Sequence, residues 1–497
     1  MKKMQILTKN RRFLIFTTLV PILLFVGSCD KQLDELRPHN VIFEDAQFDR
    51  PEGYSKAVTG IYALIASGSE QGFTGVFTDQ QIFFSEAKGN TIKSLDAQIN
   101  RLTDAFDYVN SSSRDLSDSY VYWRSAYNVL LHINKVLSRI APDEANAVIL
   151  QAKGEALFLR GYLYFNLVRL YGKPYYQDPS NSLGVMLVLS GDISPDFAPK
   201  RASVQAVYQQ VVADLEASIP LLQAKKSNSY ASRYGAEALL SRVQLYRGGT
   251  FTAPNREANE KAFAHSDRVI REGGYTLLQD AAYRSYYNTT NVGNKEDIFA
   301  INGEFMNGSI SMLWKMPPRI NYTGGLYRPS PYLLSLMEEN DARWAFYVEN
   351  VTPGFPESNI AVNKYNIGFD AIYSRSPYRV LRLAEMYLNR AEALVKLGRN
   401  AEALADVNTI RERAGLTILS GLSGEALFQE ILKQRKIELA FEGHASYDEF
   451  RNGLPMVRNY ESGRSGQMTV QPTDPGILMQ IPDEEIADNP NLAPNPR

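Results

Sequence analysis

Apolar residues recur along most of the chain with the three- and four-residue spacing that places side chains on one face of a helix. The clearest stretch is 381–416, in which the apolar positions divide into two stripes. The first stripe consists of Leu383, Tyr387, Ala391, Leu394 and Val395, and the second of Ala403, Leu404, Val407 and Ile410. This pattern predicts two amphipathic helices in succession.

Small residues accompany these two helices. Gly398 follows the first stripe and Gly415 the second, and a glycine in the left-handed conformation commonly ends a helix. Asn400 is expected to cap the second helix, because its side chain can accept a hydrogen bond from a free backbone N–H. Ala391 and Ala403 would let the two backbones approach closely. The length of this antiparallel pair matches a tetratricopeptide unit of about 34 residues.

Weaker copies of the same pattern predict further helix pairs. Residues 120–140 precede 147–172, and 234–249 precede 259–274, while Ser203 is placed to cap an amphipathic stretch. Since a single pair cannot bury its apolar face alone, we expect about four stacked pairs that are separated in sequence. Aromatic residues with helical spacing are expected in the core of this scaffold. They are Tyr162, Tyr164, Phe165, Tyr171 and Tyr175.

Two segments lack the helical period. Residues 73–94 are rich in glycine, phenylalanine and polar residues, and residues 283–360 contain repeated glycines and prolines. The tail after Gly453 also has the composition of a loop. Long irregular loops within a compact domain are usually functional. The sequence therefore predicts a mostly α protein whose helix-pair scaffold carries long irregular loops.

The N-terminus has the three parts of a secretory signal. A basic leader precedes the apolar run 13–26, which is shorter than the ~20 residues of a membrane-spanning helix, and two small residues follow. Cys29 is the single cysteine of the chain, and residues 26–29 resemble a bacterial lipobox. We expect residues 1–28 to be a lipoprotein signal peptide and Cys29 to carry the lipid anchor of a mature domain, 29–497. The alternatives are an ordinary signal peptide with a bystander cysteine and an uncleaved anchor helix.

Composition and motifs disfavour several classes of function. The formal net charge is −2 and no region is strongly basic, which disfavours nucleic acid as a partner. The sequence contains no CxxC, GxGxxG, Walker, HExxH or GxSxG motif, and its four histidines are far apart. A glycosidase needs only two suitably spaced carboxylates, but no pair stands out. We therefore expect a binding protein that is not an enzyme and uses no cofactor or metal.

Several stretches resemble the SusD/RagB family of nutrient-binding outer-membrane lipoproteins. In the family's order, they are residues 156–176, 378–394, 404–416, 431–451 and 481–496. The last stretch, IPDEEIADNPNLAPNP, is close to the family's ending, although Ala493 stands where glutamine is usual and the Gly-Tyr ending is missing. The chain also departs from the family after Gly443, where it has HASYDEFRNGL.

The resemblance implies a fold, a location and a task. Tetratricopeptide-like helix pairs form the scaffold, and irregular loops and short strands pack against one side of it. Members lie at the cell surface, attached to the outer membrane through lipid alone, as the lid of a TonB-dependent, SusC-like transporter. They capture oligosaccharides or, in some members, oligopeptides, and they are not enzymes. A lipid-anchored hydrolase and a purely structural repeat adaptor are the other hypotheses, disfavoured by the missing motifs and by the long irregular insertion, respectively.

The resemblance also indicates where ligands would bind. In the family the ligand surface comes from an early loop and from a large central insertion, here about residues 283–360. These regions of the chain contain Phe73, Phe77, Asp79 and Asn90, and then Trp314, Arg319, Tyr322 and Tyr327. Aromatic rings can stack on the C–H faces of sugars, and carboxylate, amide and guanidinium groups can bind hydroxyls. The alternative for each aromatic residue is that it anchors its loop to the scaffold.

Charged residues in the stretch 431–451 are expected to be structural. Arg435, Glu438 and Glu442 follow helical spacing. We therefore interpret them as ion pairs that connect this helix to its neighbours, and not as part of a ligand site.

Overall fold

The computed structural model of the chain describes residues 47–67, 79–95, 103–109, 118–194, 196–289, 292–302, 327–349, 360–365 and 376–497. Contacts divide the chain into two units, Met1–Gly53 and Tyr54–Arg497. In the described part of the first unit, the backbone N–H of Gly53 donates to the Arg50 carbonyl at 2.9 Å. The second unit contains the helix scaffold, the paired strands and the cavity.

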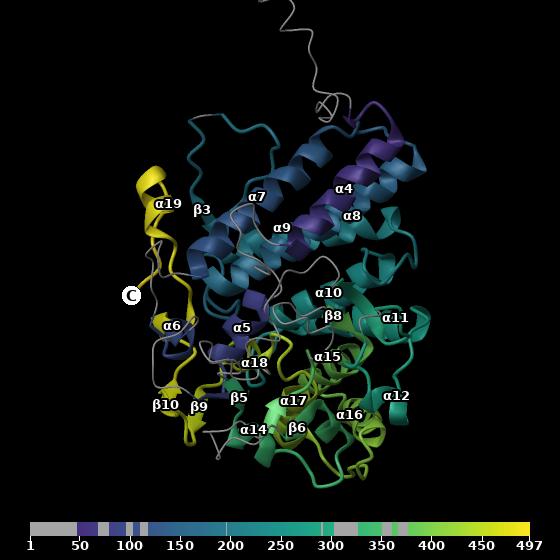
Figure 1. The fold of residues 1–497 in the computed structure, drawn as a ribbon, viewed down its shortest axis with the longest axis vertical. Coiled ribbons are helices and arrows are strands. Elements are labelled where there is room, and N and C mark those ends of the chain that lie inside the picture. The colour runs from purple at the N-terminus through teal and green to yellow at the C-terminus, as the bar shows by residue number, and fades with distance from the viewer. Residues whose placement is uncertain are drawn as a thin grey trace, which may run out of the picture. The chain divides into compact units, whose positions relative to one another are not determined.

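Helices form most of the described chain (Figure 1). The α-helices are α4 (Pro51–Ser67), α5 (Asp79–Ala87), α6 (Thr103–Phe106), α7 (Asp118–Ser138), α8 (Ala147–Tyr171), α9 (Val204–Ser218), α10 (Arg233–Arg247), α11 (Arg256–Glu272), α12 (Asp280–Arg284), α14 (Pro331–Ser335), α15 (Leu383–Lys396), α16 (Asn400–Arg413), α17 (Gly424–Glu438), α18 (Ala445–Arg451) and α19 (Asp483–Asp488). The 3-10 helices among the described residues are η1 (Ile219–Leu221), η3 (Ala342–Phe346) and η4 (Pro475–Ile477).

The scaffold consists of helices that pack on their neighbours along the chain. α7 packs on α8 and α8 on α9, while α10 packs on α11 and α15 on α16. α11 also packs on α15, and α15 on α17, which joins the later helices to one another. Within the described ranges, no helix is long and apolar enough to cross a membrane. The prediction of a mostly helical, helix-pair scaffold is confirmed.

The packing of α15 on α16 follows the apolar stripes of the sequence. Ala391 and Ala403 are fully buried and lie in the same core cluster as Leu394. Gly398 and Gly415 have φ values of +79° and +75°, which confirms that left-handed glycines end the two helices.

The predicted cap of α16 is wrong. Arg399, not Asn400, occupies the N-cap position, and its side chain makes no capping hydrogen bond. The Asn400 side chain instead accepts a hydrogen bond from the Gly424 backbone N–H at 2.9 Å. Asn400 therefore connects the start of α16 to the start of α17, a tertiary contact that outweighs its local preference for the cap.

Helix α8 is buried on nearly all sides. Tyr162, Tyr164, Phe165 and Tyr171 are at most 2% exposed, which confirms that this aromatic set is core packing, and Tyr175, beyond the helix, is half-buried. Next to α8, Ser203 caps α9 as predicted, because its hydroxyl accepts from the Ala206 backbone N–H at 3.1 Å.

Short antiparallel strand pairs connect distant segments in the described part of the chain. The strands are β1 (Ile92–Ser94), β2 (Leu183–Met186), β3 (Arg201–Ser203), β4 (Asp297–Ile301), β5 (Tyr327–Pro329), β6 (Tyr347–Glu349), β7 (Ile360–Val362), β8 (Tyr378–Arg382), β9 (Met456–Asn459) and β10 (Gln467–Val470). They pair as β1–β5, β2–β3, β4–β8, β6–β7 and β9–β10. In β4–β8, Asp297 lies opposite Arg382, so the central segment is fixed to the start of α15.

The predicted loops contain more regular structure than the sequence indicates. Residues 73–94 include α5 and β1, and the tail after Gly453 includes β9, β10 and α19. All residues of α5 from Ile82 to Ala87 are buried. A helix that is buried all round has no polar face, so its sequence lacks the apolar stripe that periodicity detects.

A network of buried ion pairs holds α17 and the turn after it. Arg382 pairs with Glu438 at 2.6 Å and with Glu442 at 2.7 Å. Arg413 also pairs with Glu438 at 2.5 Å, and Lys364 pairs with Glu442 at 2.6 Å. These five residues, here the Arg382 network, are at most 5% exposed. Burial would raise the pKa of Glu438, but Arg413 and Arg382 outweigh it and hold that pKa well below its ordinary range. The predicted ion pairs of Glu438 and Glu442 are confirmed, but the helical placement of Glu442 is wrong, because α17 ends at Glu438.

Replacing Ala391 with leucine is expected to destabilise the protein by about 1–3 kcal/mol, because the added methylenes enter a filled core. Ala405→Leu is the matched control, since Ala405 is exposed on α16. Thermal unfolding of the two variants measures the difference. A melting temperature of Ala391→Leu equal to that of the control would contradict the packing of α15 on α16.

Candidate functional site

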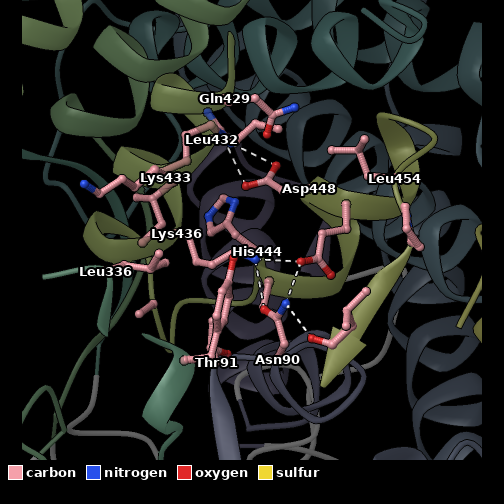
Figure 2. A pocket seen from close by; sticks show the side chains of 18 of the residues that line it. Asn90, Thr91, Leu336, Gln429, Leu432, Lys433, Lys436, His444, Asp448 and Leu454 are labelled. Carbon is pink, nitrogen blue, oxygen red and sulfur yellow. Dashed lines mark hydrogen bonds and ion pairs between the residues drawn. The ribbon is translucent and has the colours of Figure 1, made fainter. Parts of the chain in front are cut away.

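A cavity of about 480 Å³ opens between α14, α17, α18 and β9, beside the turn that follows α5 (Figure 2). Its volume is in the range of small-molecule sites, ~300–1,000 Å³. Four α17 side chains that line it follow the three- and four-residue spacing of one helix face: Gln429, Leu432, Lys433 and Lys436. Arg435, on the same helix, also lines the cavity, as do Leu439 and Ala440 just beyond the helix.

Ser330 fixes the helix that forms the opposite wall of the cavity. Its hydroxyl accepts from the Leu333 backbone N–H at 3.0 Å and so caps α14, which begins with Pro331. The same hydroxyl donates to the Asn90 carbonyl at 2.6 Å. Tyr332, in the first turn of α14 and 39% exposed, therefore lines the same cavity as Asn90. Segments 73–94 and 283–360, both predicted to bind ligand, meet here.

Three polar side chains form a hydrogen-bonded network at the base of the cavity, drawn with dashed lines in Figure 2, in which Glu449 Oε2 has no partner among the described residues. The Asn90 amide donates to Glu449 at 3.0 Å and to the Val457 carbonyl at 3.2 Å. Lys436 donates to the Asn90 side-chain oxygen at 2.9 Å and to Glu449 at 2.6 Å. Burial lowers the pKa of Lys436, but Glu449 and Tyr332 outweigh it, so the pKa is raised and the ammonium stays charged.

A second pair of charges lies deeper beside α18. Arg435 pairs with Asp448 at 3.1 Å and donates to the Asn389 side chain at 2.7 Å. The predicted ion pair of Arg435 is therefore confirmed, although Arg435 also lines the cavity. His444 is 5% exposed, and burial, followed by the charges of Arg242 and Arg435, lowers its pKa well below the ordinary value. At neutral pH its imidazole is uncharged, so it adds no charge to the cavity.

The structure places some of the predicted ligand residues and not others. Asn90 lines the cavity, although its amide is committed to the network just described. Tyr327 lies in β5 and is fully buried, with its ring centroid 5.1 Å from that of Phe83, so it packs its strand against α5 and presents no open face. Asp79 is the first residue of α5. The other predicted residues, Cys29, Phe73, Phe77, Trp314, Arg319 and Tyr322, lie outside the described residues.

Sequence reasoning missed three residues of the cavity mouth. Tyr332, Gln429 and Val457 line the cavity, and all three are exposed. The signal for Tyr332 was available, because Ser-Pro-Tyr reads as a helix start that carries an aromatic ring in its first turn. No local signal identifies Val457, because its exposure depends on the pairing of β9 with β10.

The chemistry of the cavity is that of binding. Its carboxylates are engaged with cations: Glu449 with Lys436 and Asp448 with Arg435. In the described part of the chain, no group of three or more histidine, cysteine or acidic residues could hold a metal ion. An exposed aromatic ring and aliphatic walls offer contact surface to a ligand.

Two family profiles match the chain. The profile described as "SusD family" matches residues 332–497, and the profile described as "Starch-binding associating with outer membrane" matches residues 45–245. Among curated relatives, SusD-like protein P2 of Formosa agariphila is 27% identical over 431 residues, which cover 75% of this chain and 79% of the relative. SusD-like protein P25 of the same organism is 24% identical, and the alignment covers 94% of this chain and 95% of the relative.

Solved structures share the whole fold. A SusD superfamily protein from Bacteroides thetaiotaomicron matches with a TM-score of 0.77 and 27% sequence identity. The match covers 90% of this chain and 100% of that protein's chain. A SusD-like carbohydrate binding protein from Bacteroides vulgatus has a TM-score of 0.75 at 22% identity, covering 89% of this chain and 97% of its own. The profile matches in both halves of the chain, the related sequences and the common fold show that this chain belongs to the SusD/RagB family of non-catalytic binding proteins.

Proposed function

We propose that this protein captures oligosaccharides at the outer membrane and delivers them to a TonB-dependent, SusC-like transporter. The observation that carries the proposal is the match of residues 45–245 to the profile described as starch-binding and associating with the outer membrane. The cavity supports it, because the two segments predicted to bind ligand meet there through the Ser330–Asn90 hydrogen bond. Tyr332 adds an exposed ring of the kind that stacks on sugars.

The attachment to the membrane belongs to the same proposal. Cys29 follows an apolar run and two small residues, and lipid on its sulfur would hold the protein to the outer membrane, facing the cell exterior. Labelling of cells with a radioactive fatty acid tests this step. The wild-type protein is expected to take up label and Cys29→Ala is not. Label on the variant would contradict the anchor.

Trp314→Ala is expected to weaken oligosaccharide binding at least about tenfold, a loss of about 1.4 kcal/mol. Trp314 is the largest ring in a segment whose prolines and glycines, Pro317, Pro318, Gly324 and Gly325, are expected from the sequence to restrict and bend the chain. A segment that is already shaped loses less entropy when a flexible ligand binds. Calorimetry with an oligosaccharide found on a glycan array measures the effect.

Trp344→Ala is the control for this experiment. Trp344 is half-buried in η3, outside the cavity lining, and its indole N–H donates to the Glu338 carbonyl at 2.9 Å. Its loss should leave the affinity unchanged in protein that melts cooperatively. Equal affinities of wild type and Trp314→Ala, with normal melting, would remove Trp314 from the ligand site.

A further inference from the structure

We propose that the cavity between α14, α17, α18 and β9 is a subsite for an apolar substituent, such as an acyl ester group, on the captured glycan. This inference rests on the proposed function for the identity of the glycan that carries the group. It follows from a contrast between the interior of the cavity and its mouth.

The interior of the cavity is walled by aliphatic side chains. Leu439, Ala440 and Ala445 are buried, and Leu336, Leu432 and Leu454 are half-buried along the sides. Such a surface gains from contact with apolar groups at about 25 cal/mol per Å² removed from water. It offers nothing to the hydroxyl groups of a sugar ring, which lose their hydrogen bonds to water when buried there.

Most polar groups of the interior are engaged with one another. Asn90, Lys436 and Glu449 are bonded to one another, and Arg435 is paired with Asp448. To bind a hydroxyl group, the Asn90 amide would have to break a charge-assisted hydrogen bond, which is among the strongest in proteins. Two buried atoms, Glu449 Oε2 and His444 Nδ1, have no hydrogen-bond partner among the described residues, so the polar side of the cavity is small beside its aliphatic walls.

The mouth of the cavity has a different chemistry. Tyr332 presents a ring that is 39% exposed, with Lys436 Nζ 5.0 Å from its centroid, and the exposed residues Gln429 and Asn459 also line the cavity. Neither amide makes a hydrogen bond to any residue that the structure describes. An aromatic face with free amides fits a sugar ring and its hydroxyls. A ligand that satisfies both regions carries a sugar at the mouth and an apolar group in the interior.

Alkyl glucosides test the cavity without knowledge of the natural glycan. Hexyl β-D-glucopyranoside is expected to bind the full chain at least about tenfold more tightly than methyl β-D-glucopyranoside. Burial of part of the longer alkyl chain in the cavity is enough to account for a roughly tenfold difference in affinity. Val457→Asp places a carboxylate at the mouth, where Val457 is 43% exposed, and should remove the difference. Leu336→Asp, on another element, should do the same, which guards against a folding defect limited to β9.

Ile418→Asp is the matched control, since Ile418 is 55% exposed and does not line the cavity. This variant should keep the tenfold preference for the hexyl glucoside. Equal affinities of the two glucosides for the wild type would overturn the proposal, as would a preference that survives both cavity variants. Binding of N-acetyl-leucinamide in the cavity without any preference for the hexyl glucoside would also overturn it, in favour of a peptide side chain.

Acetylated xylo-oligosaccharides, before and after alkaline removal of the esters, separate this inference from the proposed function. Tighter binding of the acetylated form by wild type but not by Val457→Asp supports the subsite. Equal binding of the two forms keeps oligosaccharide capture and rejects an acyl subsite. A third outcome is that no oligosaccharide binds, although the protein still prefers the hexyl glucoside over the methyl glucoside. This outcome rejects the proposed function, and it also rejects a glycan as the molecule that carries the apolar group.

Discussion

Arg382→Met is expected to lower the free energy of unfolding by about 3–5 kcal/mol, because the buried carboxylates lose one of their cations, although they keep Arg413 and Lys364. Arg382 is 2% exposed and contacts Glu438 at 2.6 Å, Glu442 at 2.7 Å and, more distantly, Glu296 at 3.4 Å. It also donates to the Glu438 backbone carbonyl at 2.7 Å. Methionine has a similar length but provides no charge. The loss of stability in this variant therefore comes mainly from the missing ion pairs and less from changed packing. Urea unfolding followed by circular dichroism measures it.

Arg399→Met is the matched control for this variant. Arg399 pairs with Glu402 at 2.5 Å, but the two side chains are 39% and 55% exposed. Exposed pairs of this kind contribute about 0–1 kcal/mol, because water screens the charges. Similar losses in the two variants would contradict the view that the Arg382 network holds the turn after α17 in place.

Glu392→Gln is expected to destabilise the protein by a similar amount, about 3–5 kcal/mol near neutral pH. Glu392 is fully buried on α15 and accepts hydrogen bonds from Arg451 at 2.6 Å and from Lys396 at 3.1 Å. Glutamine keeps the shape but removes the charge, so Lys396 loses its carboxylate partner and Arg451 keeps only Asp448. The control is Glu402→Gln, since Glu402 lies on α16 with its side chain 55% exposed.

The loss of stability caused by Glu392→Gln should become smaller as the pH falls. Burial raises the pKa of Glu392, but Arg451 and Lys396 outweigh it and lower that pKa well below the ordinary value of 4.5. A carboxylate with a lowered folded-state pKa stabilises the fold above its unfolded-state pKa, and this contribution disappears as the pH falls towards the folded-state value.

The stability gap between wild type and Glu392→Gln should therefore be constant from about pH 6 to 7 and shrink below about pH 4.5, by about 1.4 kcal/mol per pH unit. The two proteins should be compared below about pH 7, because burial lowers the pKa of Lys396 to about 8. Above about pH 7 the titration of Lys396 would add its own pH dependence to the gap. Urea unfolding of both proteins from pH 3 to 7 measures the gap. A gap that is unchanged at pH 3 would mean that Glu392 is not ionised in the folded protein.

Local periodicity was sufficient to predict the scaffold but not the contacts between its parts. Ala391, Ala403, Gly398 and Gly415 were placed correctly, because helix faces and left-handed glycines depend on nearby residues. Asn400 was misplaced, because its bond to Gly424 joins residues that are 24 positions apart. Helix α5 was missed because its residues from Ile82 to Ala87 are all buried, so this part has no polar face to reveal a helix.

The candidate site was predicted only in part, for the same physical reason. Asn90 and Tyr327 were chosen for their residue type and segment, but exposure is set by tertiary packing. Tyr327 is buried against Phe83, whereas Tyr332, five positions later in the chain, is exposed at the cavity mouth. The ion pairs of Glu438 were predicted from helical spacing, but the same spacing misplaced Glu442, which lies beyond the end of α17 and bonds Arg382, 60 positions away.

Binding of the purified protein to an array that carries both glycans and peptides tests the central claim most directly. Oligosaccharide capture predicts that the protein binds a set of oligosaccharides that share one backbone and leaves them intact, as read by chromatography after incubation. Binding to peptides with no glycan bound, or cleavage of the bound glycan, would contradict the account.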